Sequence, residues 1–257
     1  MAAKVDVKPK VVKTILVSQP EPAKRSAYFD LEKKYGIKVD FRPFIHVEGI
    51  SSKEFRKQRI HIEDFTSIVL TSKKSVDHFF RMCEELRIKM PQTTKYFCTS
   101  EAIALYLQKF IVYRKRKVFF GKRTLIDLSP SLNKHKKKEK FLIPCSDQGK
   151  ADFEAYMTKN EFDFQIAHMY KTVSSDLSDL SDITYDMLVF FSHLSIKSLY
   201  ENFPDFKQNE TRLAVYGSKT HRAVEERGLE INIKAPNEVT TSMTTAIGHY
   251  LKTSNKE

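Results

Sequence analysis

The chain reads SIVLTSKKSVDHFF at residues 67–80 and MLVFFSHLSIKSLY at residues 187–200, and these two stretches align without a gap. Each is a short apolar run followed by apolar residues at helical spacing. A serine stands where each run ends, Ser72 in the first stretch and Ser192 in the second. Strands of this kind that lead into amphipathic helices are typical of parallel sheets in α/β proteins. The chain is therefore predicted to contain two similar α/β halves.

The same alternation extends along most of the chain. A second pair of stretches, 96–105 and 215–224, aligns with one residue out of step. Strands are expected at 14–18, 67–72, 95–98, 140–146, 186–192, 212–217 and 229–234, and each of them leads into a helix. Residues 37–47 alternate like a strand, but Pro43 argues for an edge or a connecting ribbon. The predicted fold is α/β, with parallel sheets flanked by helices.

Composition restricts the class of protein. The 257 residues allow one large domain or two ordinary ones, and a hydrophobic share of 41% is enough for a core. No apolar run is long enough to cross a membrane, and the N-terminal 13 residues lack a signal-peptide core. The three cysteines are far apart, which favours reduced thiols over a disulfide framework or a zinc site. We expect a cytoplasmic protein.

The positive charge is unevenly distributed. The net charge is +12, and residues 43–171 carry 25 Lys and Arg against 15 Asp and Glu. Such an excess attracts anions, namely nucleic acid, phosphate or a polycarboxylate, although it also serves solubility alone. Residues 112–123 form a basic, β-rich stretch, and the charge run at 132–140 is interpreted as a solvated loop tip before a buried strand.

Motifs of several enzyme classes are absent. The chain has no glycine-rich dinucleotide or P-loop motif, no GxSxG elbow and no HExxH. No cofactor and no metal are expected, so any catalysis would depend on positioning and on hydroxyl groups. Hydroxyl residues do recur where strands meet helices, which is where open α/β sheets bind ligands and where helix amides favour anions. For any single residue, a helix N-cap explains the hydroxyl equally well.

Four motifs, in this order, resemble the uroporphyrinogen-III synthase family. They are VLTSKKSV at 69–76, IAHMYKT at 166–172, VFFSHLSI at 189–196 and AVYGSKTHRAVEERGL at 214–229. The tail IKAPNEVTTSMTTAI is similar to the family's ending. The resemblance spans nearly the whole chain from Ile15, and the order and spacing of the motifs carry it, since each one is loose.

The resemblance implies a discontinuous architecture. One lobe would comprise residues 1–42 and 172–257, and an inserted basic lobe would comprise residues 43–171. A two-stranded connector, from 38–47 and 163–173, would join the lobes, with the active-site cleft between them.

The resemblance also implies the reaction and its residues. The family substrate, hydroxymethylbilane, bears eight carboxylates, loses a hydroxyl as water, and closes with its last ring inverted through a spiro intermediate. Tyr170 matches the family tyrosine and is the candidate acid for the leaving hydroxyl. Strand alternation would place Tyr170 on one face with His168 and Thr172. The residues expected to bind the substrate are Ser72, Thr99, Ser100, Ser192, Ser218, Lys219 and Thr220. Glu101 stands where the family often has threonine, which puts that contact in question.

Two alternatives compete with this enzyme. The chain could be a basic nucleic-acid-binding or regulatory α/β protein that uses residues 112–140, or a bilobal receptor for a small anion. The enzyme interpretation predicts a monomer that binds a small-molecule substrate, no nucleic acid and no membrane.

Overall fold

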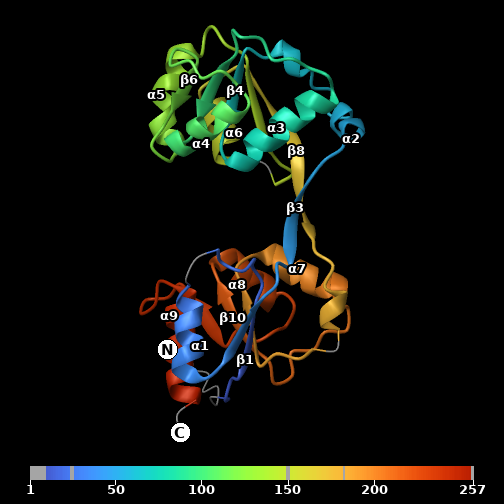
Figure 1. Ribbon diagram of the computed structural model, residues 1–257, viewed down its shortest axis with the longest axis vertical. Coiled ribbons are helices and arrows are strands. Elements are labelled where there is room, and N and C mark those ends of the chain that lie inside the picture. The colour runs from blue at the N-terminus through green and yellow to red at the C-terminus, as the bar shows by residue number, and fades with distance from the viewer. Residues whose placement is uncertain (1–9, 24–25, 149–150, 182, 256–257) are drawn as a thin grey trace. The chain divides into compact units, whose positions relative to one another are not determined.

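The computed structural model describes residues 10–23, 26–148, 151–181 and 183–255. These residues form two compact units (Figure 1). Unit 1 contains the residues up to His46 and those from Val173 onward, and unit 2 is Val47–Thr172. The prediction that the N-terminal 13 residues lack a signal-peptide core falls mostly on residues 1–9, which lie outside the described residues. None of the described helices is both long and apolar enough to cross a membrane.

Unit 1 contains a parallel sheet of five strands in the order β11-β10-β9-β1-β2. Its strands are β1 (Thr14–Val17), β2 (Lys38–Phe41), β9 (Met187–Phe190), β10 (Arg212–Tyr216) and β11 (Ile233–Ala235). Its helices are α1 (Ala27–Tyr35), α7 (His193–Asn202), α8 (Ser218–Glu225) and α9 (Met243–Ser254), with a 3₁₀ turn at Ser178–Leu180. One core cluster joins α1 and α9 to the sheet, and another joins α7 and α8 to it, so helices cover both faces.

Unit 2 repeats this plan with the strand order β3-β8-β7-β4-β5-β6, in which the pairs from β8 to β6 are parallel. Its strands are β3 (Ile45–Gly49), β4 (Ser67–Leu70), β5 (Lys95–Cys98), β6 (Val118–Phe120), β7 (Phe141–Ser146) and β8 (Phe164–Ser174). Its helices are α2 (Ser52–Arg56), α3 (Lys73–Glu85), α4 (Glu101–Tyr106), α5 (Leu125–His135) and α6 (Ala151–Lys159), with 3₁₀ turns at Ile62–Asp64 and Leu107–Lys109. Helices α3 and α4 pack in one core cluster, and α5 and α6 in another. The predicted fold class is confirmed.

The chain passes between the units twice, within β3 and within β8, which are neighbours in one sheet. Pro43 separates β2 from β3, so the predicted ribbon at 37–47 is two strands that belong to different sheets. Proline has no backbone N–H to donate to a ladder, which is why the pairing stops there. A division into domains at residues 42 and 171 stays a prediction.

Three local expectations were wrong or incomplete. The strand predicted at 229–234 begins only at Ile233, the first residue of β11. The Gln208 side chain bonds both the N–H and the carbonyl of Glu230 and so takes the place of a strand partner there. In the basic stretch 112–123, only β6 is a strand. Helix α5 was not expected; a capping box between Thr124 and Asp127 starts it, and it includes the first residues of the charge run.

The charge run also contains a buried ion pair. Glu139 is 8% exposed and pairs with Lys95, and it accepts a hydrogen bond of 2.9 Å from the Ser67 hydroxyl. Burial alone would raise the pKa of Glu139, but the hydrogen bonds from Lys95, Thr66 and Ser67 outweigh it and leave that pKa below its usual value. The interpretation of 132–140 as a fully solvated loop tip is therefore wrong at Glu139.

Candidate functional site

In unit 2, the predicted hydroxyl residues lie at the carboxyl ends of the adjacent strands β4 and β5. Ser72 is the N-cap of α3 and forms a capping box with Ser75, whose N–H donates to the Ser72 Oγ over 3.0 Å. Thr99 is buried, and its hydroxyl donates to the carbonyl of Thr71 over 3.2 Å. Ser100 is the N-cap residue of α4 but makes no capping hydrogen bond through its side chain. The structure thus brings Ser72, Thr99 and Ser100 to one edge of the sheet.

Tyr170 reaches the same edge because of a β-bulge in β8. Cys145 of β7 pairs with His168 and Ser146 pairs with Tyr170, so Met169 is the extra residue. A bulge of this kind reverses the alternation of side chains beyond it. Tyr170 therefore joins the core cluster that contains Met169, and the prediction that it shares a face with His168 is wrong.

The hydroxyl of Tyr170 lies near that of Ser72, close enough for Ser72 to lower the pKa of the phenol. The ring stacks on the imidazole of His78, with centroids 4.8 Å apart and planes at 21°. Tyr170 is only 6% exposed. Burial raises the pKa of Tyr170, and nearby Cys145 adds to this, while Ser72 lowers it; the net direction is upward. The phenol therefore stays protonated at neutral pH and can act as a hydrogen-bond donor.

Arg81 of α3 holds the bulge in place, a role that motif spacing did not indicate. Its guanidinium donates to the carbonyls of Ile50 and Met169, over 2.9 and 3.2 Å. It passes so close to Gly49 that a Cβ there would lie 2.6 Å from the guanidinium carbon. Burial, together with the charge of Arg81, lowers the pKa of His78, which keeps the ring on Tyr170 neutral.

Unit 1 presents corresponding residues at the ends of β9 and β10. Ser192 is the N-cap of α7 and accepts the Leu194 N–H over 3.2 Å. Gly217 has a φ of 85°, a conformation that favours glycine, and it leads directly into α8. Ser218 and Lys219 are exposed, whereas Thr220 is 3% exposed.

Ser18 is a residue that the sequence argument missed. It directly follows β1, the neighbour of β9, and its buried hydroxyl has no hydrogen-bond partner among the described residues. The strand order reverses between β1 and β9, and ligands of open α/β sheets bind at such a point. The available signal was a serine at the end of an apolar strand, the pattern that singled out Ser72 and Ser192.

A groove of about 630 Å³ lies beside the bulge on the other side of β8. His168 lines it, together with Asp147 and the three lysines Lys53, Lys57 and Lys171. The imidazole of His168 contacts the carbonyl of Ser146 at 2.8 Å. None of the eight predicted site residues lines this groove.

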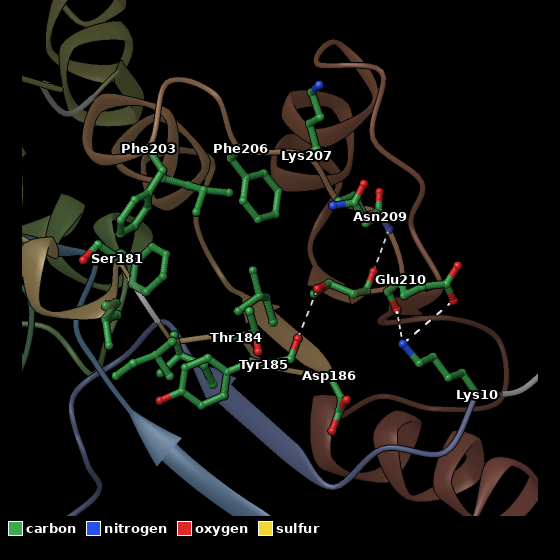
Figure 2. A pocket seen from close by; sticks show the side chains of 18 residues that line it. Lys10, Ser181, Thr184, Tyr185, Asp186, Phe203, Phe206, Lys207, Asn209 and Glu210 are labelled. Atoms are coloured by element: carbon green, nitrogen blue, oxygen red, sulfur yellow. Dashed lines mark hydrogen bonds and ion pairs between the residues drawn. The ribbon is translucent and has the colours of Figure 1, made fainter.

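Another cavity, of about 480 Å³, lies within unit 1 (Figure 2). It is at the amino-terminal ends of the strands, since Asp186 directly precedes β9 and Thr211 directly precedes β10. Lys10 lies 3.8 Å from the Glu210 carboxylate at its rim (Figure 2). None of the predicted site residues lines this cavity either, which separates it from the strand ends where anion-binding amides gather.

Among the residues that the structure describes, no three His, Cys, Asp or Glu side chains are grouped so that they could hold a metal ion. The three cysteines are free and buried. The chemical groups at the candidate site are therefore hydroxyls, backbone amides, a phenol and lysines. Fold and site together define an α/β protein of the doubly wound type with strand-end groups suited to an anionic ligand.

A family model described as uroporphyrinogen-III synthase HemD matches residues 26–245. The chain belongs to the uroporphyrinogen-III synthase family. A search of curated proteins by sequence returns no match.

The fold agrees with that of one solved structure with a TM-score above 0.5. The uroporphyrinogen-III synthetase of Helicobacter pylori is 15% identical, with a TM-score of 0.54 and coverage of 93% of this chain and 99% of that one. A mutant uroporphyrinogen III synthase from the extremely thermophilic bacterium Thermus thermophilus is 14% identical, with a TM-score of 0.47 and coverage of 95% and 100%.

Family membership confirms the activity predicted from the sequence. The enzyme is a cyclising hydro-lyase of tetrapyrrole and haem biosynthesis. The alternative of a nucleic-acid-binding or regulatory protein without catalysis is not favoured.

Proposed function

We propose that this enzyme closes hydroxymethylbilane mainly by orienting it, with Tyr170 as the group that assists departure of the hydroxyl. The observation that carries the proposal is the place of Tyr170, which follows the bulge of β8, stacks on His78 of α3 and lies near Ser72, the N-cap of that helix. Orientation is the main requirement because the reaction must yield the inverted ring, and a positioned reactant gains rate without any cofactor.

A chain of hydrogen bonds would make the phenol a better donor. The Ser75 N–H donates to the Ser72 oxygen, which leaves the Ser72 hydroxyl proton free for the Tyr170 oxygen. The Tyr170 proton can then be donated to the leaving hydroxyl of the substrate. Successive donors polarise one another, so each bond in such a chain is strengthened. We propose that Tyr170 gives this proton to the hydroxyl as the C–O bond breaks, so that water leaves, and that the phenol regains a proton from the pyrrole N–H of the ring that becomes the electrophile; its raised pKa keeps it protonated between turnovers.

The predicted residues at the strand ends of each unit would offer donors to substrate carboxylates. A capping serine accepts from a helix amide, so its own hydroxyl proton remains available to an anion; this describes Ser192 in unit 1. The exposed Ser218 and Lys219 would donate a second hydroxyl and an ammonium group. Thr99 and Thr220 are buried, so we propose that they shape their turns and contribute backbone amides more than hydroxyls. Ser100 completes the set in unit 2.

We further propose that the enzyme is a cytoplasmic monomer of two domains that needs no cofactor or metal and binds no nucleic acid. The experiment is turnover of hydroxymethylbilane by the purified protein in the presence of a chelator, with the product isomers separated by chromatography. Formation of the inverted isomer supports the proposal. Accumulation of only the non-inverted isomer, which forms without an enzyme, would overturn it.

A further inference from the structure

The segment 102–126 combines two features that the proposed function does not use. It contains seven Lys and Arg and no Asp or Glu. It also holds five of the eight large hydrophobic side chains that are exposed among the described residues, namely Leu105, Phe110, Val112, Phe120 and Ile126. Exposed apolar side chains gathered in one place indicate an interaction site more often than single ones do.

These side chains gather around one edge of the sheet in unit 2. Strand β6 is the last strand of the sheet, and both α4 and α5 contact it (Figure 1). Leu105, Lys115 and Phe120 line one shallow groove of about 370 Å³. Val112 and Ile126 are each 81% exposed. We call this the β6-edge surface; it consists of Leu105, Val112, Phe120, Ile126, Lys109, Arg114, Lys115, Arg116, Lys117, Lys122 and Arg123.

Within the described part of the chain, none of the seven cations of the β6-edge surface forms an ion pair. Two carboxylates adjoin the surface: Asp127 interacts with Lys122, and Glu101 lines the groove. Arg114 and Lys117 donate to neutral oxygens, the side-chain amide of Gln92 and the carbonyl of Thr93. Lys109 lies over the ring of Tyr106, 4.5 Å from its centroid. Their positive charge therefore remains available to an anionic partner.

We propose that the β6-edge surface binds peripherally to the surface of an anionic lipid bilayer. The most exposed apolar side chains, Val112 and Ile126, are aliphatic and stand clear of the groove, so they suit insertion among lipid chains. The surrounding cations match the negative charge of acidic headgroups. Single-stranded nucleic acid would instead stack its bases on aromatic side chains. The β6-edge surface includes one aromatic side chain, Phe120, and at 42% exposed it is less accessible than Val112 and Ile126. The surface thus adds a membrane partner that the sequence did not lead us to expect, and it is independent of the role of Tyr170.

The first test is co-sedimentation with vesicles of phosphatidylcholine, with and without phosphatidylserine. We expect binding only when phosphatidylserine is present, and its loss at high salt. The double variant Lys115→Glu with Arg116→Glu should weaken partitioning roughly tenfold or more, since each basic residue near such a surface contributes substantially. The matched control is Lys137→Glu with Lys138→Glu, which changes the net charge equally at exposed positions outside the surface. This control should lose much less.

The second test uses the absence of tryptophan from the chain. In Val112→Trp the only indole reports on the β6-edge surface, and we expect its fluorescence to shift to the blue when phosphatidylserine vesicles are added. Val239→Trp, at a position 77% exposed in unit 1, should show no shift. Hydroxymethylbilane turnover confirms that each variant is folded.

Three outcomes would overturn the proposal. They are no binding to either kind of vesicle at low salt, equal losses in the surface and control charge variants, and a preference for RNA over phosphatidylserine vesicles. Failure here would leave the turnover assay unaffected, so it is distinguishable from failure of the proposed catalytic function.

Discussion

Replacing Tyr170 with phenylalanine removes one oxygen and leaves the ring stacked on His78. Positioned proton donors typically contribute about 10²–10⁴-fold to a rate, and this reaction depends more on orientation. We therefore expect Tyr170→Phe to lower kcat roughly ten- to a hundredfold, which is about 1.4–2.7 kcal/mol of transition-state stabilisation.

The stability effect of the same change should be small. The variant loses at most one hydrogen bond, worth about 1 kcal/mol, while the Ser72 oxygen still accepts the N–H of Ser75. For a chain of this size, that corresponds to a fall in Tm of about 2–4 °C. A kinetic loss of ten- to a hundredfold at a temperature well below the Tm therefore cannot come from unfolding.

Hydroxymethylbilane turnover with separation of the product isomers distinguishes the possible roles. If Tyr170 assists only the departing hydroxyl, the slower variant still makes the inverted isomer. If the variant releases more non-inverted product, Tyr170 also orients the substrate. The matched control is Tyr156→Phe in the same unit, because the buried Tyr156 hydroxyl has no partner among the described residues and its loss should leave kcat unchanged. A wild-type kcat for Tyr170→Phe would refute the reasoning and make Tyr170 a packing residue.

Three further changes follow from contacts around the site and core. Ser72→Ala should lower kcat several-fold and lower the free energy of unfolding by about 1 kcal/mol. Ser242→Ala removes a similar cap from α9 and should lower stability without changing kcat. Thermal melts and turnover assays compare the two variants, and equal kcat values would contradict the prediction. Gly49→Ala should displace the guanidinium of Arg81 and loosen the bulge at Met169. We expect a lower kcat with little change in KM. Unchanged kinetics would show that Arg81 does not position the phenol of Tyr170. Glu139→Gln should destabilise the protein by about 1–3 kcal/mol at pH 7, because the partly buried Lys95 loses its charged partner. The pKa of Glu139 in the folded state lies below its ordinary value of 4.5. The stabilisation is therefore complete at a pH above the unfolded-state pKa and is lost as the pH falls through the folded-state pKa. Urea melts of the variant and the wild type should converge at acid pH.

Much of the fold was accessible from local pattern. Apolar runs that lead into amphipathic helices predicted β1, β4, β5, β7, β9 and β10, because strands covered on both faces need little polar alternation. The repeated serine at Ser72 and Ser192 predicted two equivalent strand-to-helix turns, and both residues are helix N-caps. Helix α5 was missed although Thr124 and Asp127 have the spacing of a capping box, since the following charge run was given more weight.

The sequence by itself determined the α/β class, the two related halves and the family, since these depend on periodicity, on residue types at chain turns and on the order of motifs. Only the tertiary structure decided which groups meet. A single extra residue, Met169, reverses the side chains of β8 and brings Tyr170 to Ser72, and no period-two pattern contains that information. Arg81 acts on the carbonyl of Met169 across 88 positions in the chain. Long-range contacts of this kind depend on how strands and helices pack in three dimensions, and a local pattern records only neighbours along the chain.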